Sequence, residues 1–472
     1  MKQAIVLIHG IGEQKPMGTL RRFVTAVLGV KPNGQDSFWS KPDRMSELFE
    51  LRCLSSIGRT SAHFYEYYWA YNVEGTTVRH VLSWLWTLVR RSGKDVPESA
   101  RTLWLMARAL AILVLTLVVT GGVGAMEKWF SDIPKFTPVW LLMAGSALVL
   151  QFYFTRYLGD AARYCSAVPE NIRLRQTIRK EGLTLLRTLH ERGDYDRIIV
   201  VGHSLGSVIG YDLITRLWQE YNDKYPALEE TAGKAAIRAA LDRNESPQPA
   251  VRDQISHVGE RLSANSDEAE VAEFQQTQKS VWLELRKLGN PWRITDFITL
   301  GSPLTHAMLL LADSREDFEG RQRQRELPTC PPQRDQKGYA YSPRQPLDLG
   351  EGKKFTPLFL HHAAPFAATR WTNLYFPTVL GFFGDFVGGP LRPVFGNGIR
   401  DVKVRTEGYG GLANITLLAH TEYWRPADNG DSRLSLPVLR EALALSQLRN
   451  FRGPVAGKEK EAQDQDDQDP DG

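Results

Sequence analysis

The stretch "RIIVVGHSLGSVIGYDL", residues 197–213, decides the fold of this chain. Arg197 to Val201 is typical of a buried strand, Gly202 to Gly206 of a tight turn, and the residues after it have the spacing of a helix. A strand, a sharp turn and a helix are what a Gly-x-Ser-x-Gly nucleophile elbow requires. The stretch therefore predicts that Ser204 is a nucleophile at the start of a helix, where the dipole and free N–H groups favour a developing anion.

Further strands are expected on both sides of this stretch. Apolar runs with strand-like composition are Ala4 to Ile8, His63 to Ala70, Ile294 to Leu300 and Trp371 to Phe376. A helix is expected from about Asn171 to Arg192, leading into the central strand. Because apolar strands that alternate with helices form mostly parallel sheets, the sequence predicts the α/β class, with a mostly parallel central sheet flanked by helices.

Composition excludes several classes of protein. The chain has 472 residues, and 58 Lys and Arg against 54 Asp and Glu give a formal net charge of +4. A charge this small offers no argument for a nucleic-acid partner. The three cysteines are far apart in the sequence, which argues against a disulfide framework or a zinc site and favours a reducing compartment. We expect no metal and no cofactor, and nothing in the sequence specifies the oligomeric state.

Two long runs interrupt the α/β pattern. Residues 109–126, "ALAILVLTLVVTGGVGAM", and residues 136–155, "FTPVWLLMAGSALVLQFYFT", contain no charged side chain. At about 1.5 Å per residue, a helix of either length is as long as the core of a bilayer is thick. The runs predict a transmembrane hairpin with spans at about 105–126 and 136–155, inside an insertion of residues 76–168. The alternatives are two buried core helices or a hairpin that enters one leaflet.

Basic residues lie just before the first span and just after the second, where the hairpin joins the two long parts of the chain. They are Arg90, Arg91, Lys94, Arg101 and Arg108 before the first span, and Arg156, Arg163, Arg173 and Arg175 after the second. Cytoplasmic loops carry an excess of Lys and Arg. The pattern therefore predicts an integral protein of the cell (inner) membrane with a cytoplasmic catalytic domain.

The remaining boundaries follow from composition. We expect residues 1–75 and 169–452 to form one α/β domain on either side of the hairpin insertion. Within the second part, the charged helical stretch 222–288 is interpreted as a cap over a site, and residues 314–354 as a polar loop. Residues 453–472 are acidic and lack aromatic side chains, which is typical of a disordered, solvated tail.

With these motifs, the chain resembles the α/β-hydrolase superfamily of serine lipases and esterases. "VLIHGIGEQ" is similar to the family's His-Gly segment, and "FITLGSPLTHAML" is similar to a later strand and its loop. The resemblance implies an oxyanion hole made by backbone N–H groups of Leu205 and of Gly10 or Ile11. His9 would then hold the loop, and its alternative role is that of the catalytic base.

The acid of a triad should follow the serine and precede the histidine. "WTNLYFPTVLGFFGDFVGGPL" resembles the segment where the family places this acid, which assigns Asp385. The apolar "TVLGFFG" is interpreted as an inserted loop. Asp401 and Asp296 are the alternatives. Asp401 is expected at an exposed strand position because "GIRDVKV" alternates, and Asp296 precedes the expected acid strand.

The base is expected in "LLAHTEYW", which matches the family pattern of a His followed by polar residues and Tyr-Trp. This assigns His420. His361 and His362 in "FLHHAAP" are alternatives, and His306 is expected to belong to a loop after a strand. If the three residues converge, His420 takes the proton of Ser204, and Asp385 holds the tautomer of the imidazole.

Within the superfamily, "GHSLGSVIGYDL", "LGSPL" and the His-x-x-Tyr-Trp element are similar to intracellular phospholipase A1-like enzymes. Together with the hairpin and "LGFFGDF", this resemblance predicts a membrane-anchored serine hydrolase of carboxylic esters. Its substrate would be a lipid or phospholipid ester, and the bilayer would be its partner. The alternatives are an esterase or thioesterase acting on soluble acyl substrates, and an inactive membrane scaffold or effector with the same fold.

Overall fold

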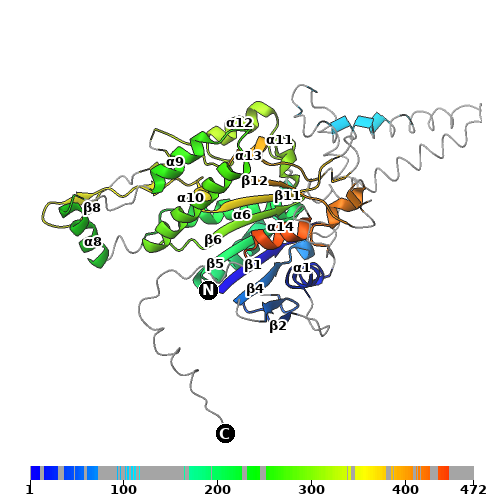
Figure 1. Ribbon diagram of the computed structural model, residues 1–472, viewed down its shortest axis with the longest axis horizontal. Coiled ribbons are helices and arrows are strands. Elements are labelled where there is room, and N and C mark those ends of the chain that lie inside the picture. The colour runs from blue at the N-terminus through cyan, green and yellow to red at the C-terminus, as the bar shows by residue number, and fades with distance from the viewer. Residues whose placement is uncertain are drawn as a thin grey trace, which may run out of the picture.

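The computed structural model describes residues 2–72 and 169–445, together with residue 164 and isolated positions between 93 and 116. Gaps within these ranges are residues 11–14, 30–36, 47, 58–60, 193, 226–230, 245–250, 337, 342–345, 379–383, 386, 408–410, 412, 415 and 426–433. The largest feature of the described part is an eight-stranded sheet (Figure 1).

The strands of this sheet follow the order β12-β11-β6-β5-β1-β4-β3-β2. Neighbours from β12 to β4 pair in parallel, and β3 and β2 add an antiparallel edge. The strands are β1 (Lys2–Ile8), β2 (Phe38–Pro42), β3 (Arg52–Ser56), β4 (Ser61–Tyr67), β5 (Arg197–His203), β6 (Ile294–Leu300), β11 (Arg370–Tyr375) and β12 (Arg400–Lys403). Two short ribbons pair β7 (Ala340–Tyr341) with β10 (Phe359–Leu360), and β8 (Leu347–Asp348) with β9 (Lys354–Phe355).

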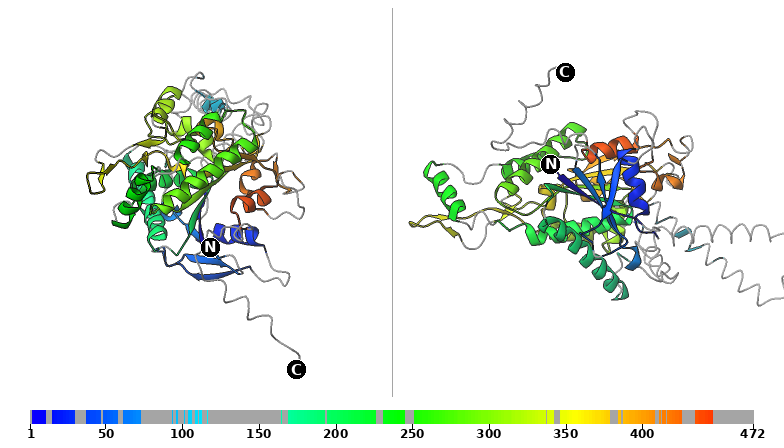
Figure 2. Two further views of the ribbon diagram at one scale, coloured as in Figure 1. Left: turned by 60° about the vertical axis from the view of Figure 1, so that its left-hand side comes forward. Right: turned by 90° about the horizontal axis from the view of Figure 1, so that it is seen from below.

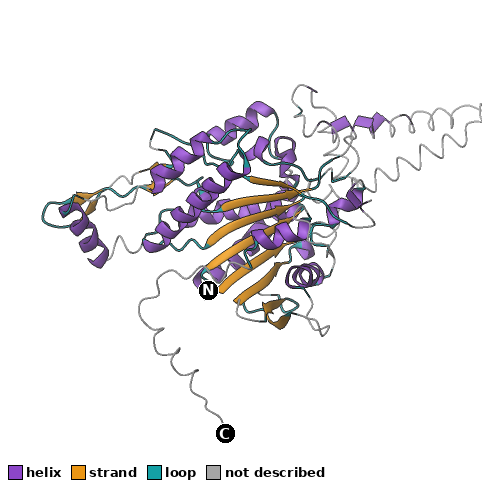
Figure 3. Ribbon diagram, in the orientation of Figure 1, coloured by secondary structure: helices purple, strands orange, loops and turns teal. Residues whose placement is uncertain are grey.

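Helices connect the strands and lie on both faces of the sheet (Figure 3). The α-helices are α1 (Gly18–Leu28), α5 (Pro169–Glu191), α6 (Leu205–Tyr221), α8 (Thr231–Asp242), α9 (Val251–Arg261), α10 (Glu268–Lys287), α11 (Ala307–Leu310), α12 (Arg315–Arg323), α13 (Arg392–Phe395) and α14 (Ser435–Ala442). Short 3-10 helices are η1 (Ala70–Asn72), η4 (Pro303–His306), η5 (Pro365–Ala367) and η7 (Leu417–Thr421).

Successive residues of the central strand face two different hydrophobic cores. Ile198 and Val200 belong to the core that contains the apolar faces of α5, α6 and α10, whereas Ile199 and Val201 belong to the core that contains α1 and α14. Side chains alternate between faces along a strand, so a continuous apolar run fits a strand covered on both sides. Figure 2 shows the resulting layers, with the blue α1 and the red α14 together on one side of the sheet.

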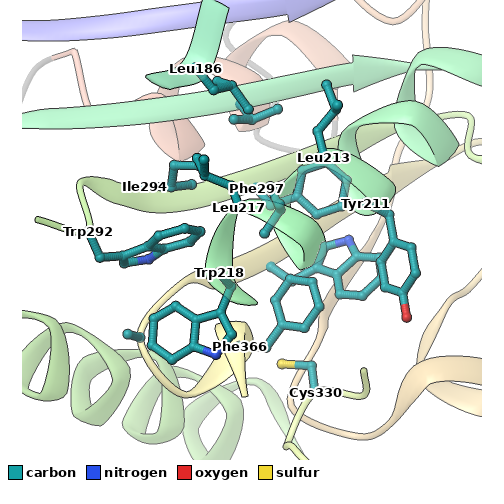
Figure 4. Close-up of a cluster of buried hydrophobic side chains, with 14 of the residues drawn as sticks. Leu186, Tyr211, Leu213, Leu217, Trp218, Trp292, Ile294, Phe297, Cys330 and Phe366 are labelled. Carbon is teal, nitrogen blue, oxygen red and sulfur yellow. The ribbon is translucent and has the colours of Figure 1, made fainter. Parts of the chain in front are cut away.

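The core beneath α6 is rich in aromatic rings (Figure 4). Trp218 of α6 meets Trp292 edge-on, with ring centroids 5.0 Å apart. Tyr211 stacks on Phe366 at 6.1 Å. Aromatic side chains bury more area than any others, and such pairs add to that burial. They hold α6 against the sheet, and this fixes the position of its first residue beside β5.

The predicted fold class is wrong in its transmembrane insertion. Within the part of the chain that the structure describes, no helix is long and apolar enough to cross a membrane. The expected two-helix hairpin is not supported, and neither is the integral inner-membrane localisation that depended on it. Most of the expected spans, 105–126 and 136–155, lie outside the described residues. The expectation rested on length and absence of charge, which apolar helices buried in proteins share.

Two other predicted segments take part in the fold. The stretch 222–288, interpreted as a cap, contains α8, α9 and α10, and α10 packs against β11 and β12 of the sheet. Helix α10 is therefore part of the layer that covers the sheet. The polar loop 314–354 contains α12, whose first turn is capped by the Ser314 hydroxyl, which accepts the Asp317 N–H at 3.0 Å. The tail 453–472 lies outside the described residues.

Candidate active site

Ser204 lies in a strained turn between β5 and α6. Its backbone has φ 50° and ψ −128°, a conformation that costs a residue with a side chain about 1–3 kcal/mol. Neighbouring groups hold it in place. The Ser204 N–H donates to the carbonyl of Leu300 at 2.9 Å, and the Ser207 hydroxyl donates to the Ser204 carbonyl at 2.6 Å. The turn is therefore built into the junction of the two elements.

The two glycines of the motif are required by close backbone contacts. A Cβ atom on Gly206 would lie 2.0 Å from the carbonyl oxygen of Ile8, and one on Gly202 would lie 2.5 Å from the Cα of Ser207. Neither position can hold a side chain without moving the backbone. Glycine is therefore needed at both positions because α6 packs so closely against β1 and against the turn before it.

Ser204, His420 and Asp385 form one chain of contacts. The Nε2 of His420 lies 2.9 Å from the Oγ of Ser204, and its Nδ1 lies 3.0 Å from both carboxylate oxygens of Asp385. All three are buried, with Ser204 and His420 each 4% exposed and Asp385 1% exposed. Since Nδ1–H donates to the carboxylate, Nε2 is left to accept the serine hydroxyl proton. The structure brings together the three residues named from the sequence.

Asp385 lies after β11, in a socket of hydrogen-bond donors. Its Oδ1 accepts the N–H groups of Val387 at 3.0 Å and Gly388 at 2.9 Å, and its Oδ2 accepts the hydroxyl of Tyr423 at 2.7 Å. Burial raises the pKa of this carboxyl, but His420, the Tyr423 hydroxyl and the Gly388 N–H outweigh it and lower the pKa to about 2. The carboxylate is therefore charged at neutral pH.

A second histidine supports the segment that carries His420. The Nε2–H of His203, the residue before Ser204, donates to the backbone carbonyl of His420 at 2.9 Å. Its ring packs perpendicular to Trp424, with centroids 4.9 Å apart. Burial and the nearby His420 lower the pKa of His203 to about 3. His203 is thus a neutral donor that positions η7 and not a second base.

Two further glycines let Asp385 and His420 meet. Gly301, after β6, has φ 56°, and a Cβ on it would lie 2.9 Å from the Oδ2 of Asp385 and 3.0 Å from the Nδ1 of His420. A Cβ on Gly388 would lie 2.6 Å from the Cα of Gly301. The "LGSP" and "VGGP" segments therefore cross at a point where only glycine fits, directly behind the contact between Asp385 and His420.

The expected oxyanion hole is described in part. Leu205 is the first residue of α6, and the N–H groups of a helix's first turn have no acceptor within the helix. Gly10 follows β1, and a Cβ on it would lie 2.7 Å from the Cβ of Ser204. The backbone at Gly10 therefore lies against Ser204. Ile11 lies outside the described residues. His9, which precedes Gly10 in the loop after β1, stacks on Trp69, with ring centroids 5.2 Å apart.

The alternative acids have other partners. Asp401 on β12 is half-buried and not exposed as expected, because its carboxylate accepts the N–H groups of Leu391 at 2.9 Å and Arg392 at 2.8 Å. It caps the short helix α13. Asp296 is the third residue of β6, near the end of the strand that lies away from Ser204, and it forms an ion pair with Arg370 at 2.6 Å. Neither carboxylate is available to His420.

The alternative bases also have structural partners or a different environment. His361 is 1% exposed, and its Nε2–H donates to the carbonyl of Gln333 at 2.8 Å while its Nδ1 accepts the N–H of Ala363 at 3.1 Å. His362 is exposed, and His306 is buried at the end of η4. The ring that contacts Ser204 is that of His420.

Sequence reasoning missed the supporting roles of Tyr423 and His203. Both residues stand inside quoted motifs, "GHSLG" and "HTEYW": His203 directly precedes Ser204, and Tyr423 follows His420 by three residues. Their place in these motifs was the available signal. It does not say which atom each side chain reaches, because Tyr423 bonds to a carboxylate and His203 to a carbonyl from another part of the chain.

Among the described residues, no group of three or more His, Cys, Asp or Glu side chains is arranged to hold a metal ion. A scan against protein-family models and searches of curated proteins and of solved structures found no match to this chain.

Proposed function

We propose that this protein is a serine hydrolase that cleaves carboxylic esters through an acyl-enzyme. The observation that carries the proposal is the chain of contacts from the Ser204 hydroxyl through the His420 imidazole to the Asp385 carboxylate. Acyl transfer needs a nucleophile, a base within hydrogen-bond reach of it, and a group that orients the base. Three side chains with these properties meet at one point.

In the first half of the reaction, the Oγ of Ser204 attacks the carbonyl carbon of the ester while its proton passes to the Nε2 of His420. Asp385 stabilises the resulting imidazolium. The Leu205 N–H and the backbone at Gly10 lie beside Ser204, where donors would stabilise the oxyanion of the tetrahedral intermediate. The C–O bond to the leaving alcohol then breaks, and the alcohol takes the proton from His420.

In the second half, a water molecule replaces the alcohol. His420 takes a proton from this water, the hydroxide adds to the acyl carbon, and the bond from the acyl carbon to Ser204 breaks. The serine recovers its proton from His420, and a carboxylic acid is released. Each bond that forms is matched by one that breaks, so the cycle consumes only ester and water.

The strained backbone of Ser204 supports an active site over an inactive scaffold. A serine at φ 50° carries a local cost of about 1–3 kcal/mol. A glycine would relieve this cost if the turn had only a structural role. The sequence favoured a membrane lipid as substrate because it predicted a transmembrane hairpin. Since that hairpin is not supported, the proposal names carboxylic esters as the substrate class and does not specify a lipid.

A fluorophosphonate probe tests this proposal directly, because it modifies only an activated serine. Wild-type protein should be labelled at Ser204, as identified by peptide mass spectrometry, and Ser204→Ala should not be labelled. Hydrolysis of a p-nitrophenyl ester should fall by several orders of magnitude in the same variant. Ser280→Ala is the matched control, since Ser280 lies on α10 and its hydroxyl donates to the Gln276 carbonyl of the same helix at 3.3 Å. Folded wild-type protein that neither reacts nor hydrolyses esters would contradict the proposal.

A further inference from the structure

A basic hollow lies between α5 and α6. It has a volume of about 610 Å³. Its charged lining consists of Arg173, Arg179, Lys180 and Arg187 of α5 and Arg216 of α6. The other lining residues among those described are uncharged, so no acidic side chain lies in the wall itself. We call this feature the basic groove.

A second hollow of about 360 Å³ adjoins the basic groove and shares Arg179 and Arg216 with it. It adds two further cations, Arg175 and Arg321. Its acidic lining residues are Asp212 and Glu326. From the sequence, Arg173 and Arg175 were expected on the flank of a membrane span, whereas the structure places them in the walls of these two hollows.

Acidic partners neutralise only part of this charge. Asp212 lies 2.5 Å from the Nη2 of Arg179 and 3.3 Å from the Nε of Arg216. Glu220 pairs with Arg187 at 2.5 Å, and Glu326 pairs with Arg321 at 2.9 Å.

The remaining cations keep an excess of positive charge. Among the described residues, neither Arg173 nor Lys180 takes part in an ion pair, and both are exposed. Among the described residues, the two hollows are therefore lined by seven cations and two carboxylates, and Glu220, the partner of Arg187, is a third carboxylate nearby.

This excess favours an anionic ligand. A concave surface of one charge with low-dielectric walls concentrates its field and raises the local concentration of anions. The side chain of Arg179 is 15% exposed, so its charge is screened less by water than that of a surface arginine. Arginine forks also match the geometry of phosphate oxygens.

We propose that the basic groove and the adjoining hollow bind a soluble, phosphate-bearing small molecule at a site separate from the triad. Asp212 and Arg216 lie eight and twelve residues after Ser204 on α6, about 12 and 18 Å along the helix axis. The ligand site is thus on the flank of the helix whose first turn carries the nucleophile. The proposal does not depend on the hydrolase activity.

Calorimetric titration of the full-length protein with inorganic pyrophosphate tests this site. Wild-type protein should bind about one equivalent, with an affinity that falls as salt is added. The double variant Arg173→Gln, Lys180→Gln should bind at least about tenfold more weakly, because two charge-assisted contacts are lost. Neither side chain forms an ion pair among the described residues, so the variant should remain folded.

The matched control removes the same charge elsewhere. Arg315 and Arg323 are exposed on α12, and each pairs with Glu319 of the same helix. The double variant Arg315→Gln, Arg323→Gln should therefore bind pyrophosphate within about twofold of wild type. Fluorophosphonate labelling should be the same in all three proteins. Absence of pyrophosphate binding, equal weakening in both double variants, or binding to anionic phospholipid vesicles without binding to pyrophosphate would each overturn the proposal.

Discussion

The central strands bury a charged side chain at their carboxyl ends and another at their amino ends, but the two side chains have different partners. At the carboxyl ends of β5, β6 and β11, the Asp385 carboxylate meets a histidine that contacts the strained Ser204. At the amino ends, the Asp296 carboxylate meets Arg370 at 2.6 Å and Arg197 at 4.0 Å. Both carboxylates are buried, at 1% and 5% exposed respectively.

The amino-end cluster joins the strands to one another. Arg197 begins β5 and donates two hydrogen bonds to the side-chain oxygen of Gln3 on β1, at 2.9 and 2.6 Å. Asp296 on β6 connects this pair to Arg370, the first residue of β11. A carboxylate held by arginines is a fixed charge, whereas one held by an imidazole can stabilise a proton that arrives on the ring. Burial alone therefore does not identify a catalytic acid.

The largest expected difference between the two ends is in activity. Asp385→Asn should lower kcat/KM for ester hydrolysis by a factor of about 10⁴, because the amide cannot hold the tautomer of His420 or stabilise its imidazolium. Asp296→Asn should change the same constant by less than about threefold, and it serves as the matched control. Comparable losses of activity in both variants would contradict the expectation that Asp385 takes part in the reaction and Asp296 does not.

The second difference is in stability. Asp296→Asn should lower the free energy of unfolding by about 3 kcal/mol, because it removes the buried carboxylate that pairs with Arg370 and faces Arg197, whose side chain is 3% exposed. Urea unfolding followed by circular dichroism measures this quantity. A variant as stable as wild type would mean that the amino-end cluster contributes no net stability.

The smallest expected effect is a loss of stability at acidic pH, to which one buried histidine at each end of the strands contributes. His203 lies at the carboxyl end, and His190 lies at the amino end, where its Nε2 accepts the N–H of Arg293 at 3.2 Å. Burial lowers the pKa of each to about 3. Unfolded histidine has a pKa of about 6.5, so the unfolded state binds more protons between these values. The contribution of each neutral histidine to the free energy of unfolding should be fully present above about pH 6.5. It should fall on acidification, by about 1 kcal/mol per histidine at about pH 5.5.

Urea unfolding at pH 7.5 and 5.5 measures this loss. His190→Gln should reduce it, since glutamine does not titrate, and histidine NMR signals should show both rings neutral in the folded protein at about pH 6. Titration of either ring at its ordinary pKa in the folded state would contradict the expectation.

Local patterns predicted the central elements well. The expected strand Ile294 to Leu300 coincides with β6, and β5 and α6 follow the strand, turn and helix of the opening motif. These segments have long apolar runs or a strict motif, so neighbouring residues are enough to specify them. The alternation of "GIRDVKV" indicated a strand at the position of β12, whereas β2 and β3 were not predicted. Both are short, and β2 is mostly exposed, so their pairing depends on the neighbouring strand more than on their own residues.

The choice among candidate acids shows where sequence reasoning ends. Asp385, Asp401 and Asp296 all lie near strands, and each is at least half-buried. Their roles differ because the parallel sheet places Asp385 beside His420, Asp401 against the first turn of α13, and Asp296 among arginines. The hairpin prediction was wrong for a related reason. Length and hydrophobicity are local properties, whereas the surroundings of an apolar segment are not.

By itself, the sequence determined the strand, turn and helix around Ser204, because glycine spacing and an apolar run are local constraints on the backbone. It also determined the order in which a serine, an acid and a histidine occur along the chain. Only the tertiary structure decided which carboxylate and which imidazole reach Ser204, and which cations gather between α5 and α6. A hydrogen bond depends on a separation of about 3 Å in space, and residues far apart in the chain come that close only when the sheet has formed.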